Sequence, residues 1–124
     1  MTNQRRQLGN AGERGVVERA IAAGLKAFRQ PMSGQLKDFP ADLQLSSPQI
    51  KVLGESKVRS LSLSPRGKRS LTLDLDWLRK VVREARAHNF DHAALFVRPK
   101  GSVADRFVLL EESVYFDLLR HYHP

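Results

Sequence analysis

A short run of residues, Glu55-Ser56-Lys57, carries the side chains of this chain that are best suited to chemistry. On a β-strand, residues two apart point to the same face, so Glu55 and Lys57 would lie side by side. Asp42 begins an earlier strand candidate, and a neighbouring place in the sheet would bring two carboxylates and one ammonium together. Magnesium prefers carboxylate oxygens, and a bound metal ion activates water and neutralises charge that develops on phosphorus. The three side chains therefore suffice for magnesium-dependent hydrolysis of a phosphodiester bond.

The charge balance favours a nucleic acid as the partner. The chain has 21 Lys and Arg residues against 13 Asp and Glu, which gives a formal net charge of +8. Such an excess promotes nucleic-acid binding through phosphate neutralisation and counterion release. An anionic membrane surface would require a basic amphipathic helix with aromatic anchors, and the sequence contains no such helix. We expect a nucleic-acid partner and no membrane partner.

Length and composition limit the class of protein further. A chain of 124 residues is expected to form one domain around one core. The absence of cysteine excludes disulfides, a thiolate nucleophile and a thiolate zinc site. No apolar run approaches the roughly 20 residues of a membrane helix, and the Arg-rich N-terminal region lacks the features of a signal peptide. We expect a cytoplasmic protein.

Hydrophobic periodicity predicts the first helix. Residues 1–9 are expected to form a flexible basic terminus, and the helix is predicted to begin near Asn10. Asn10 and Glu13 have the spacing of a capping box. The apolar stripe continues as far as Phe28, and Gly24 is expected only to weaken the helix.

The rest of the chain predicts a mixed sheet with helices around it. Strands at 41–45 and 50–58 are expected to form an antiparallel hairpin, followed by a basic loop at 59–71 that is rich in serine. The remaining elements are a helix at 74–88, strands at 92–97 and 106–110, and a helix at 113–120. This order predicts a single α/β domain with a mixed central β-sheet flanked by helices.

The residues of the candidate site belong to a longer pattern. The pattern comprises Gly9 to Arg14, Arg29, Ser33-Gly34, Pro40-Ala41-Asp42 and Glu55-Ser56-Lys57. Its order resembles the archaeal-type (Hjc-like) Holliday junction resolvases of the PD-(D/E)XK nuclease superfamily, and phage-encoded relatives of similar length share this layout. The likeness covers nearly the whole chain, by layout more than by identity. It implies a restriction-endonuclease-like core and a phage-encoded homodimer that resolves four-way DNA junctions in the host cytoplasm.

The resemblance also implies which residues hold the metal. Asp42 and Glu55 would bind one or two Mg²⁺ ions, for which Mn²⁺ could substitute, and Glu13 would be a further acidic site residue. The backbone carbonyl of Ser56 could add an oxygen, whereas its side chain is expected to face away from the site. Asp38 is an alternative to Asp42, because the acidic residue here follows Pro-Ala rather than Pro directly. No organic cofactor is expected.

Further residues would act on the substrate. The resemblance makes Lys57 the catalytic lysine, places Ser33 in a mobile loop near the scissile phosphate, and gives Arg29 a contact with the phosphate backbone. Three cations in the basic loop are expected to follow the phosphates of the DNA: Arg66, Lys68 and Arg69. Cleavage would leave a 5′-phosphate and a 3′-hydroxyl.

Other interpretations stay open. Glu55 and Lys57 could form an exposed ion pair of little consequence, Glu13 could serve only as a helix cap, and Trp77 is expected in the core. The chain could also be a related nuclease that acts on other DNA structures. A third possibility is a non-catalytic basic module that binds nucleic acid equally well in EDTA.

Overall fold

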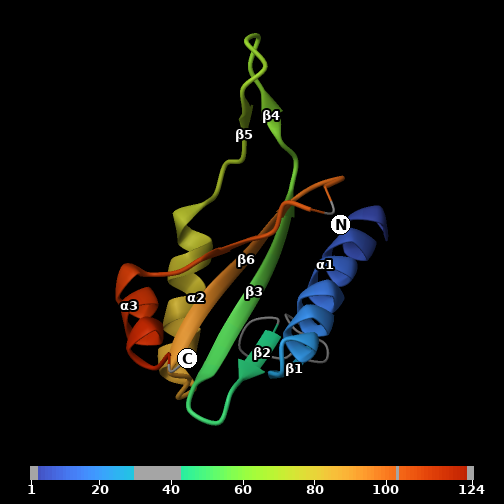
Figure 1. Ribbon diagram of the computed structural model, residues 1–124. Helices are drawn as coiled ribbons and strands as arrows, with labels where there is room; N and C mark the ends of the chain where they lie inside the picture. Colours follow the sequence, from blue (N-terminus) through green and yellow to red (C-terminus); the bar gives the residue numbers. More distant parts are fainter. Residues whose placement is uncertain (1–2, 30–42, 103, 123–124) are drawn as a thin grey trace.

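The computed structural model describes residues 3–29, 43–102 and 104–122, which form an α/β structure with a mixed five-stranded sheet (Figure 1). The strands of this sheet, in spatial order, are β1 (Lys26–Arg29), β2 (Leu43–Ser46), β3 (Lys51–Arg59), β6 (His92–Pro99) and β7 (Phe107–Leu109). The helices are α1 (Asn3–Ala22), α2 (Leu75–Ala87) and α3 (Glu112–Arg120). A separate two-stranded sheet consists of β4 (Ser62–Leu63) and β5 (Arg69–Ser70). The predicted fold class, a mixed sheet flanked by helices, is confirmed.

The long strands β3 and β6 form the centre of the sheet. They are parallel, with Glu55 opposite Leu95 and Lys57 opposite Val97, whereas the other strand pairs are antiparallel. A parallel pair needs a crossover connection, which α2 provides. Side chains alternate between the two faces of the sheet, so each central strand contributes to two different environments.

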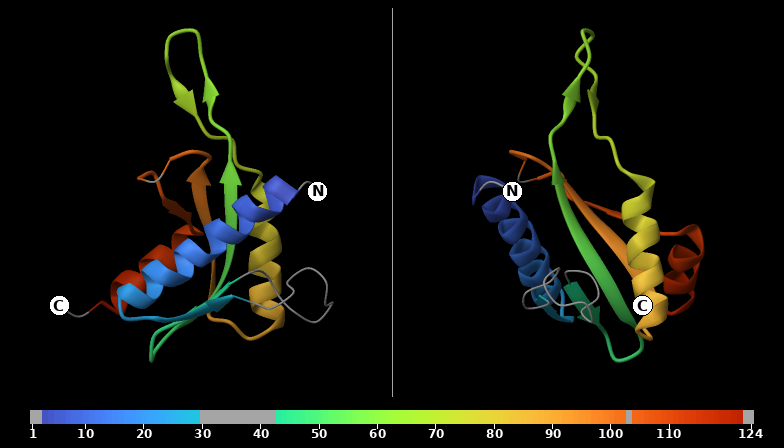
Figure 2. Two further views of the ribbon diagram at one scale, coloured as in Figure 1. Left: turned by 90° about the vertical axis from the view of Figure 1, so that its right-hand side faces the viewer. Right: turned by 180° about the vertical axis from the view of Figure 1, so that it is seen from behind.

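The helices α1 and α2 cover opposite faces of the sheet (Figure 2), and a separate apolar cluster lies under each of them. On one face, α1 places Val16 and Ala20 against the β2 residues Leu43 and Leu45. On the other face, α2 packs against the central strands. That larger cluster consists of Leu53, Leu78, Val81, Ala85, Phe90, Ala93, Leu95 and Val97. Both faces of β3 are therefore covered.

The limits of α2 agree with the prediction. Asp74 caps the helix by accepting a hydrogen bond of 2.9 Å from the backbone N–H of Asp76. His88 is the C-terminal cap residue, and Asn89 then takes a positive φ of 60° that allows the chain to turn into β6.

The limits of α1 differ from the prediction at both ends. The helix begins at Asn3 instead of Asn10, because Gln and Arg, which are frequent in this segment, are good helix formers. Glu13 therefore lies inside the helix, and its interpretation as a capping-box residue is wrong. The helix ends at Ala22, because Gly24 takes a φ of 91°. The N–H of Gly24 donates a hydrogen bond to the carbonyl of Ile21, and the N–H of Leu25 donates one to the carbonyl of Ala20. This is a Schellman motif.

Two strand segments were not predicted. The end of the expected first helix is instead strand β1, in which Phe28 and Arg29 pair with Gln44 and Leu43 of β2. The expected basic loop at 59–71 contains the β4–β5 hairpin, with Ser62 opposite Ser70 and Leu63 opposite Arg69. In both segments, pairing with a neighbouring strand decides the conformation.

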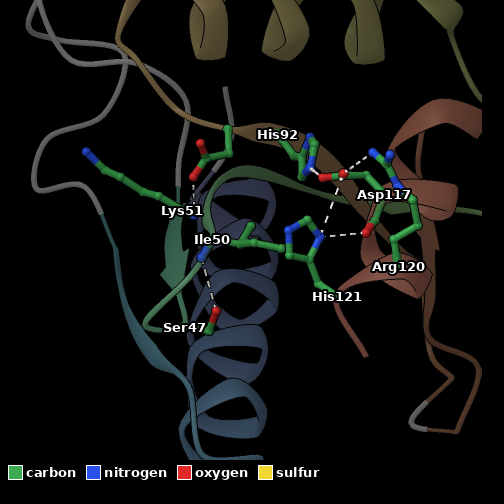
Figure 3. A network of polar contacts seen from close by, with 8 residues as sticks. Ser47, Ile50, Lys51, His92, Asp117, Arg120 and His121 are labelled. Carbon is green, nitrogen blue, oxygen red and sulfur yellow. Dashed lines mark hydrogen bonds and ion pairs between the residues drawn. The ribbon is translucent and has the colours of Figure 1, made fainter. Parts of the chain in front are cut away.

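A polar cluster connects α3 to the first residue of β6 (Figure 3). The Asp117 carboxylate accepts hydrogen bonds from His92 Nε2 at 2.7 Å and from Arg120 Nη2 at 2.6 Å. His121 Nδ1 donates to the backbone carbonyl of Asp117 at 2.8 Å. Val114 adds a buried apolar contact from the same helix. None of the helices in the described part of the chain is long and apolar enough to cross a membrane.

Gly54, next to Glu55 on β3, gives the first testable prediction. A Cβ atom at this position would lie 2.8 Å from Cε2 of Phe96 and 3.3 Å from Cδ1 of Leu45. We expect Gly54→Ala to lower the free energy of unfolding by about 1–3 kcal/mol through overpacking, measured by urea denaturation. Gly15→Ala is the matched control in α1, where the nearest atom belongs to the flexible Arg19 guanidinium. Gly15→Ala should raise the free energy of unfolding by about 0.5–1 kcal/mol. Equal losses of stability in the two variants would contradict the close contact between Phe96 and Gly54.

Asp117 gives a prediction for the pH dependence of stability. The hydrogen bond from His92, followed by that from Arg120, holds the pKa of this carboxyl below its usual range. A lowered native pKa contributes stability that is present above the unfolded pKa of 3.8 and is lost as the pH falls through the lower native value. A carbon-13 NMR titration should show the Asp117 carboxyl titrating below the unfolded value of 3.8. Asp117→Asn should remove this part of the dependence of the unfolding free energy on acid pH. A titration midpoint of Asp117 near 3.8 in the wild-type protein would contradict the hydrogen bonds of the cluster.

Candidate active site

Glu55 and Lys57 lie side by side on the central strand β3, as predicted. They share the face of the sheet that α2 covers, because Leu53, two residues before Glu55, packs in the cluster under α2. Glu55 is only 7% exposed, and its Oε1 lies 3.8 Å from Nζ of Lys57. A buried carboxylate is costly unless charges or hydrogen bonds compensate it. The interpretation of these residues as an exposed surface pair is therefore wrong.

Lys57 also contacts an aromatic ring. Its Nζ lies 5.1 Å from the ring centroid of Trp77, and the guanidinium carbon of Arg59 lies 4.4 Å from the same centroid. Trp77 itself is half-buried and packs against the larger apolar cluster, so its prediction as a core residue is correct but incomplete. Two cations on a ring anchored in the core restrict where the Lys57 ammonium can lie.

Glu13 and Arg29 form a second polar pair. Nε and Nη2 of Arg29 each lie 2.9 Å from Oε2 of Glu13, and the pair connects α1 to the edge strand β1. Charge-assisted contacts from one guanidinium fix the position of the Glu13 carboxylate. The sequence selected both residues separately, and the structure brings them together.

The other predicted residues fall into three groups. Ser33, Asp38 and Asp42 lie outside the described residues. The Ser56 side chain points to the α1 face, because a Cβ atom added to Gly12 would lie 3.1 Å from its Oγ. The three predicted DNA-binding cations are exposed and lie in or beside the β4–β5 hairpin: Arg66, Lys68 and Arg69.

A metal site is not complete within the described residues. Among 3–29, 43–102 and 104–122, no three His, Cys, Asp or Glu side chains are grouped so that they could hold a metal ion. The almost buried Glu55 carboxylate nevertheless offers oxygen donors of the type that Mg²⁺ prefers. A second carboxylate would have to come from another part of the chain.

Comparison with known proteins identifies the fold. No family model matches the chain, and no curated protein matches it. The chain is similar to the solved structure of Archaeoglobus fulgidus Hjc, a Holliday junction resolvase from an archaeal hyperthermophile. The two chains are 21% identical, the match covers 86% of this chain and 91% of that chain, and the TM-score is 0.56. This chain has the restriction-endonuclease-like fold of that resolvase. The predicted likeness of the fold is confirmed.

The sequence did not reveal the contact between the lysine and Trp77. Trp77 lies on the apolar stripe of α2, and that stripe explains the residue without any role at the site. The contact could have been predicted from the alternation of Glu55, Lys57 and Arg59 along β3, which runs parallel to β6. A helix that crosses over between two such strands covers one face of both, and α2 lies above this row of side chains.

Trp77 gives a prediction that does not depend on catalysis. In the wild-type protein, the methylene protons next to Nζ of Lys57 lie near the ring and should be shifted upfield by the ring current. Trp77→Leu should remove this shift and increase the mobility of the lysine, both measured by NMR. Trp77→Phe is the matched control, because it keeps a ring of smaller size. An unchanged Lys57 spectrum in Trp77→Leu would show that the ring does not position the ammonium.

Proposed function

We propose that this protein is a structure-selective DNA endonuclease that resolves four-way junctions by magnesium-dependent phosphodiester hydrolysis. The observation that carries the proposal is the Glu55–Lys57 pair on the central strand of a resolvase-like fold, in which Glu55 is buried and Lys57 is partly buried. A carboxylate and an ammonium on one face of a strand match the needs of phosphodiester hydrolysis, which are a metal ligand and a positive charge near the attacked phosphorus. The net charge of +8 fits a polyanionic substrate.

Asp42 is the proposed second carboxylate. It directly precedes Leu43, the first residue of β2, in the sequence. Leu43 pairs with Gly54, which is the neighbour of Glu55 on β3. This pairing beside Glu55 supports Asp42 as the proposed ligand. Asp38 is the alternative ligand.

Asp42 and Glu55 would hold the metal ion, with the Ser56 carbonyl as a further oxygen. Glu13 is proposed to assist from α1, although α1 covers the face of the sheet opposite to that of the Glu55 side chain. When bound, Mg²⁺, or Mn²⁺ in its place, lowers the pKa of a water molecule and neutralises charge on the phosphate. The number of ions, one or two, is open. Arg29 fixes the Glu13 carboxylate.

The remaining residues would act on the water and the phosphate. Lys57 would position or deprotonate the water that attacks phosphorus in line, and would stabilise the charge of the transition state. The bond from phosphorus to the 3′ oxygen breaks, which leaves a 5′-phosphate and a 3′-hydroxyl. Ser33 would lie near the scissile phosphate, and Arg29 would contact the phosphate backbone.

The assembly follows from the symmetry of the substrate. A four-way junction has two-fold symmetry, so a C2 homodimer would place two sites on paired strands. The phage origin stays a prediction of the resemblance alone, with the host cytoplasm as the corresponding place of action. Neither an organic cofactor nor a membrane partner belongs to the proposal.

The decisive test compares two DNA substrates and two metal conditions. A labelled synthetic four-way junction and a linear duplex of the same sequence are incubated with the protein in Mg²⁺ and in EDTA. We expect paired symmetric nicks in the junction alone, and only with Mg²⁺. Equal cutting of both substrates would point to a nuclease with another target, and binding of DNA without cutting would point to a non-catalytic module.

Site variants test the assignment of residues in the same assay. Glu55→Gln, Lys57→Ala and Asp42→Asn should each reduce cleavage by roughly a hundredfold or more, while junction binding persists. Lys80→Ala, which removes an exposed lysine of α2, is the matched control and should cut at the wild-type rate. Wild-type cleavage by the Glu55 and Lys57 variants would show that the site lies elsewhere.

A further inference from the structure

The β4–β5 hairpin projects away from the rest of the molecule, as both views agree (Figures 1 and 2). It begins where β3 leaves the sheet, only a few residues after Lys57, and its second strand leads back to α2. The site and the hairpin therefore share one continuous stretch of chain. The extended rise of about 3.3 Å per residue gives roughly 17 Å between Lys57 and Ser62.

The tip of the hairpin has a defined geometry. Ser64 accepts a backbone hydrogen bond from Gly67 at 2.9 Å and donates one to Lys68 at 2.9 Å. Its Oγ also accepts from the Lys68 N–H at 3.0 Å. Gly67 takes a φ of 82°, as expected for a tight turn that closes with a glycine bulge. A preformed turn loses less entropy when it binds a partner.

The two faces of the hairpin differ in polarity. Leu63 pairs with Arg69 and shares a face with it, whereas Ser62 and Ser70 lie on the other face. Leu63 is 71% exposed, the largest value among the exposed large hydrophobic side chains of the described residues. Alternation of serine and leucine normally marks a strand with one face on a core. Here that face points into solvent, although an isolated two-stranded hairpin is only marginally stable in water.

The charge of this segment selects the kind of partner. Residues 56–73 contain no Asp or Glu, and their cations are Lys57, Arg59, Arg66, Lys68 and Arg69. A protein partner with an apolar patch would match Leu63 but not this charge. A nucleic acid matches both features, because phosphates meet the cations and the faces of bases and sugars meet the apolar side chain.

We propose that the β4–β5 hairpin recognises the branch point of the junction, with its cations on the phosphates and Leu63 against bases that are unstacked there. The inference rests on the proposed function and specifies how a junction is told from a duplex. In a regular duplex the bases are stacked and offer Leu63 no comparable apolar surface. At about 3.4 Å per base pair, the distance from Lys57 places the start of the hairpin at Ser62 within about five base pairs of the cut, and the tip lies farther from it.

The test measures binding in EDTA, so that cleavage plays no part. Affinities for the four-way junction and the linear duplex are compared for the wild type, Leu63→Ser and Leu119→Ser. Leu119 is a control on α3 that is 53% exposed. Leu63→Ser should weaken junction binding on the order of tenfold, the loss expected for one apolar side chain, with duplex binding unchanged. A 2-aminopurine base at the branch point should brighten with the wild type and not with Leu63→Ser.

The cations provide an independent readout. Replacement of Arg66, Lys68 and Arg69 by glutamine should weaken the binding of both DNAs. The replacement should also make the plot of log K, where K is the binding constant, against log salt concentration less steep by about two to three, since each phosphate contact contributes about 0.9 to the slope. An unchanged slope would remove these cations from the interface.

Failure of this inference can be told from failure of the proposed function. If Leu63→Ser keeps the wild-type preference for the junction, the hairpin does not recognise the branch point, while the resolvase proposal stands. If the wild type itself binds both DNAs equally, the proposed function fails and the inference with it. If Leu63→Ser instead changes the mass of the assembly in sedimentation, the hairpin is a contact between copies of the chain, and the inference is wrong.

Discussion

The structure depends on the double role of β3, which has a different helix on each of its faces. Residues that face α1 must be small or apolar to fit under that helix, and Gly54 and Ser56 meet this condition. Residues that face α2 begin in the core at Leu53 and become ionic at Glu55 and Lys57. The transition from apolar to charged side chains takes place on one continuous strand, so the rigidity of the core extends directly to the candidate site.

Trp77 joins the apolar and ionic parts of that face. Its ring packs on the larger cluster and also supports Lys57 and Arg59. An ammonium on an aromatic face keeps much of its charge available to other groups, whereas a tight ion pair would neutralise it. The distance of 3.8 Å between Glu55 and Lys57 is longer than a hydrogen bond. This geometry suits a lysine that must also approach a phosphate.

Much of the fold could be predicted from the sequence, because the strongest patterns are local. The limits of α2, the strands β3 and β6 and the shared face of Glu55 and Lys57 follow from periodicity and capping alone. The predictions failed where pairing between distant segments decides the outcome. Phe28 continues a helical stripe, but Gly24 closes α1 and leaves the following residues free to pair with β2.

The site could be predicted only in part for a similar reason. Alternation places Glu55 beside Lys57, but no periodicity in α1 indicates that Glu13 meets Arg29 across the join between α1 and β1. In the same way, the serine-rich basic segment with Pro65 and Gly67 in its centre predicts a loop, although its serine and leucine residues alternate as in a strand. Its hairpin depends on the turn that Ser64 and Gly67 form.

The close contact between Gly54 and Phe96 also constrains how this chain can diverge. The ring occupies the volume that any side chain at position 54 would need, and the two residues lie on adjacent strands. Position 54 can therefore gain a side chain without overpacking only if position 96 becomes smaller at the same time. Among descendants of this sequence, the two positions should covary, and a single substitution at either one would leave an overfilled or an empty space on the α1 face of β3, opposite to the side chain of Glu55.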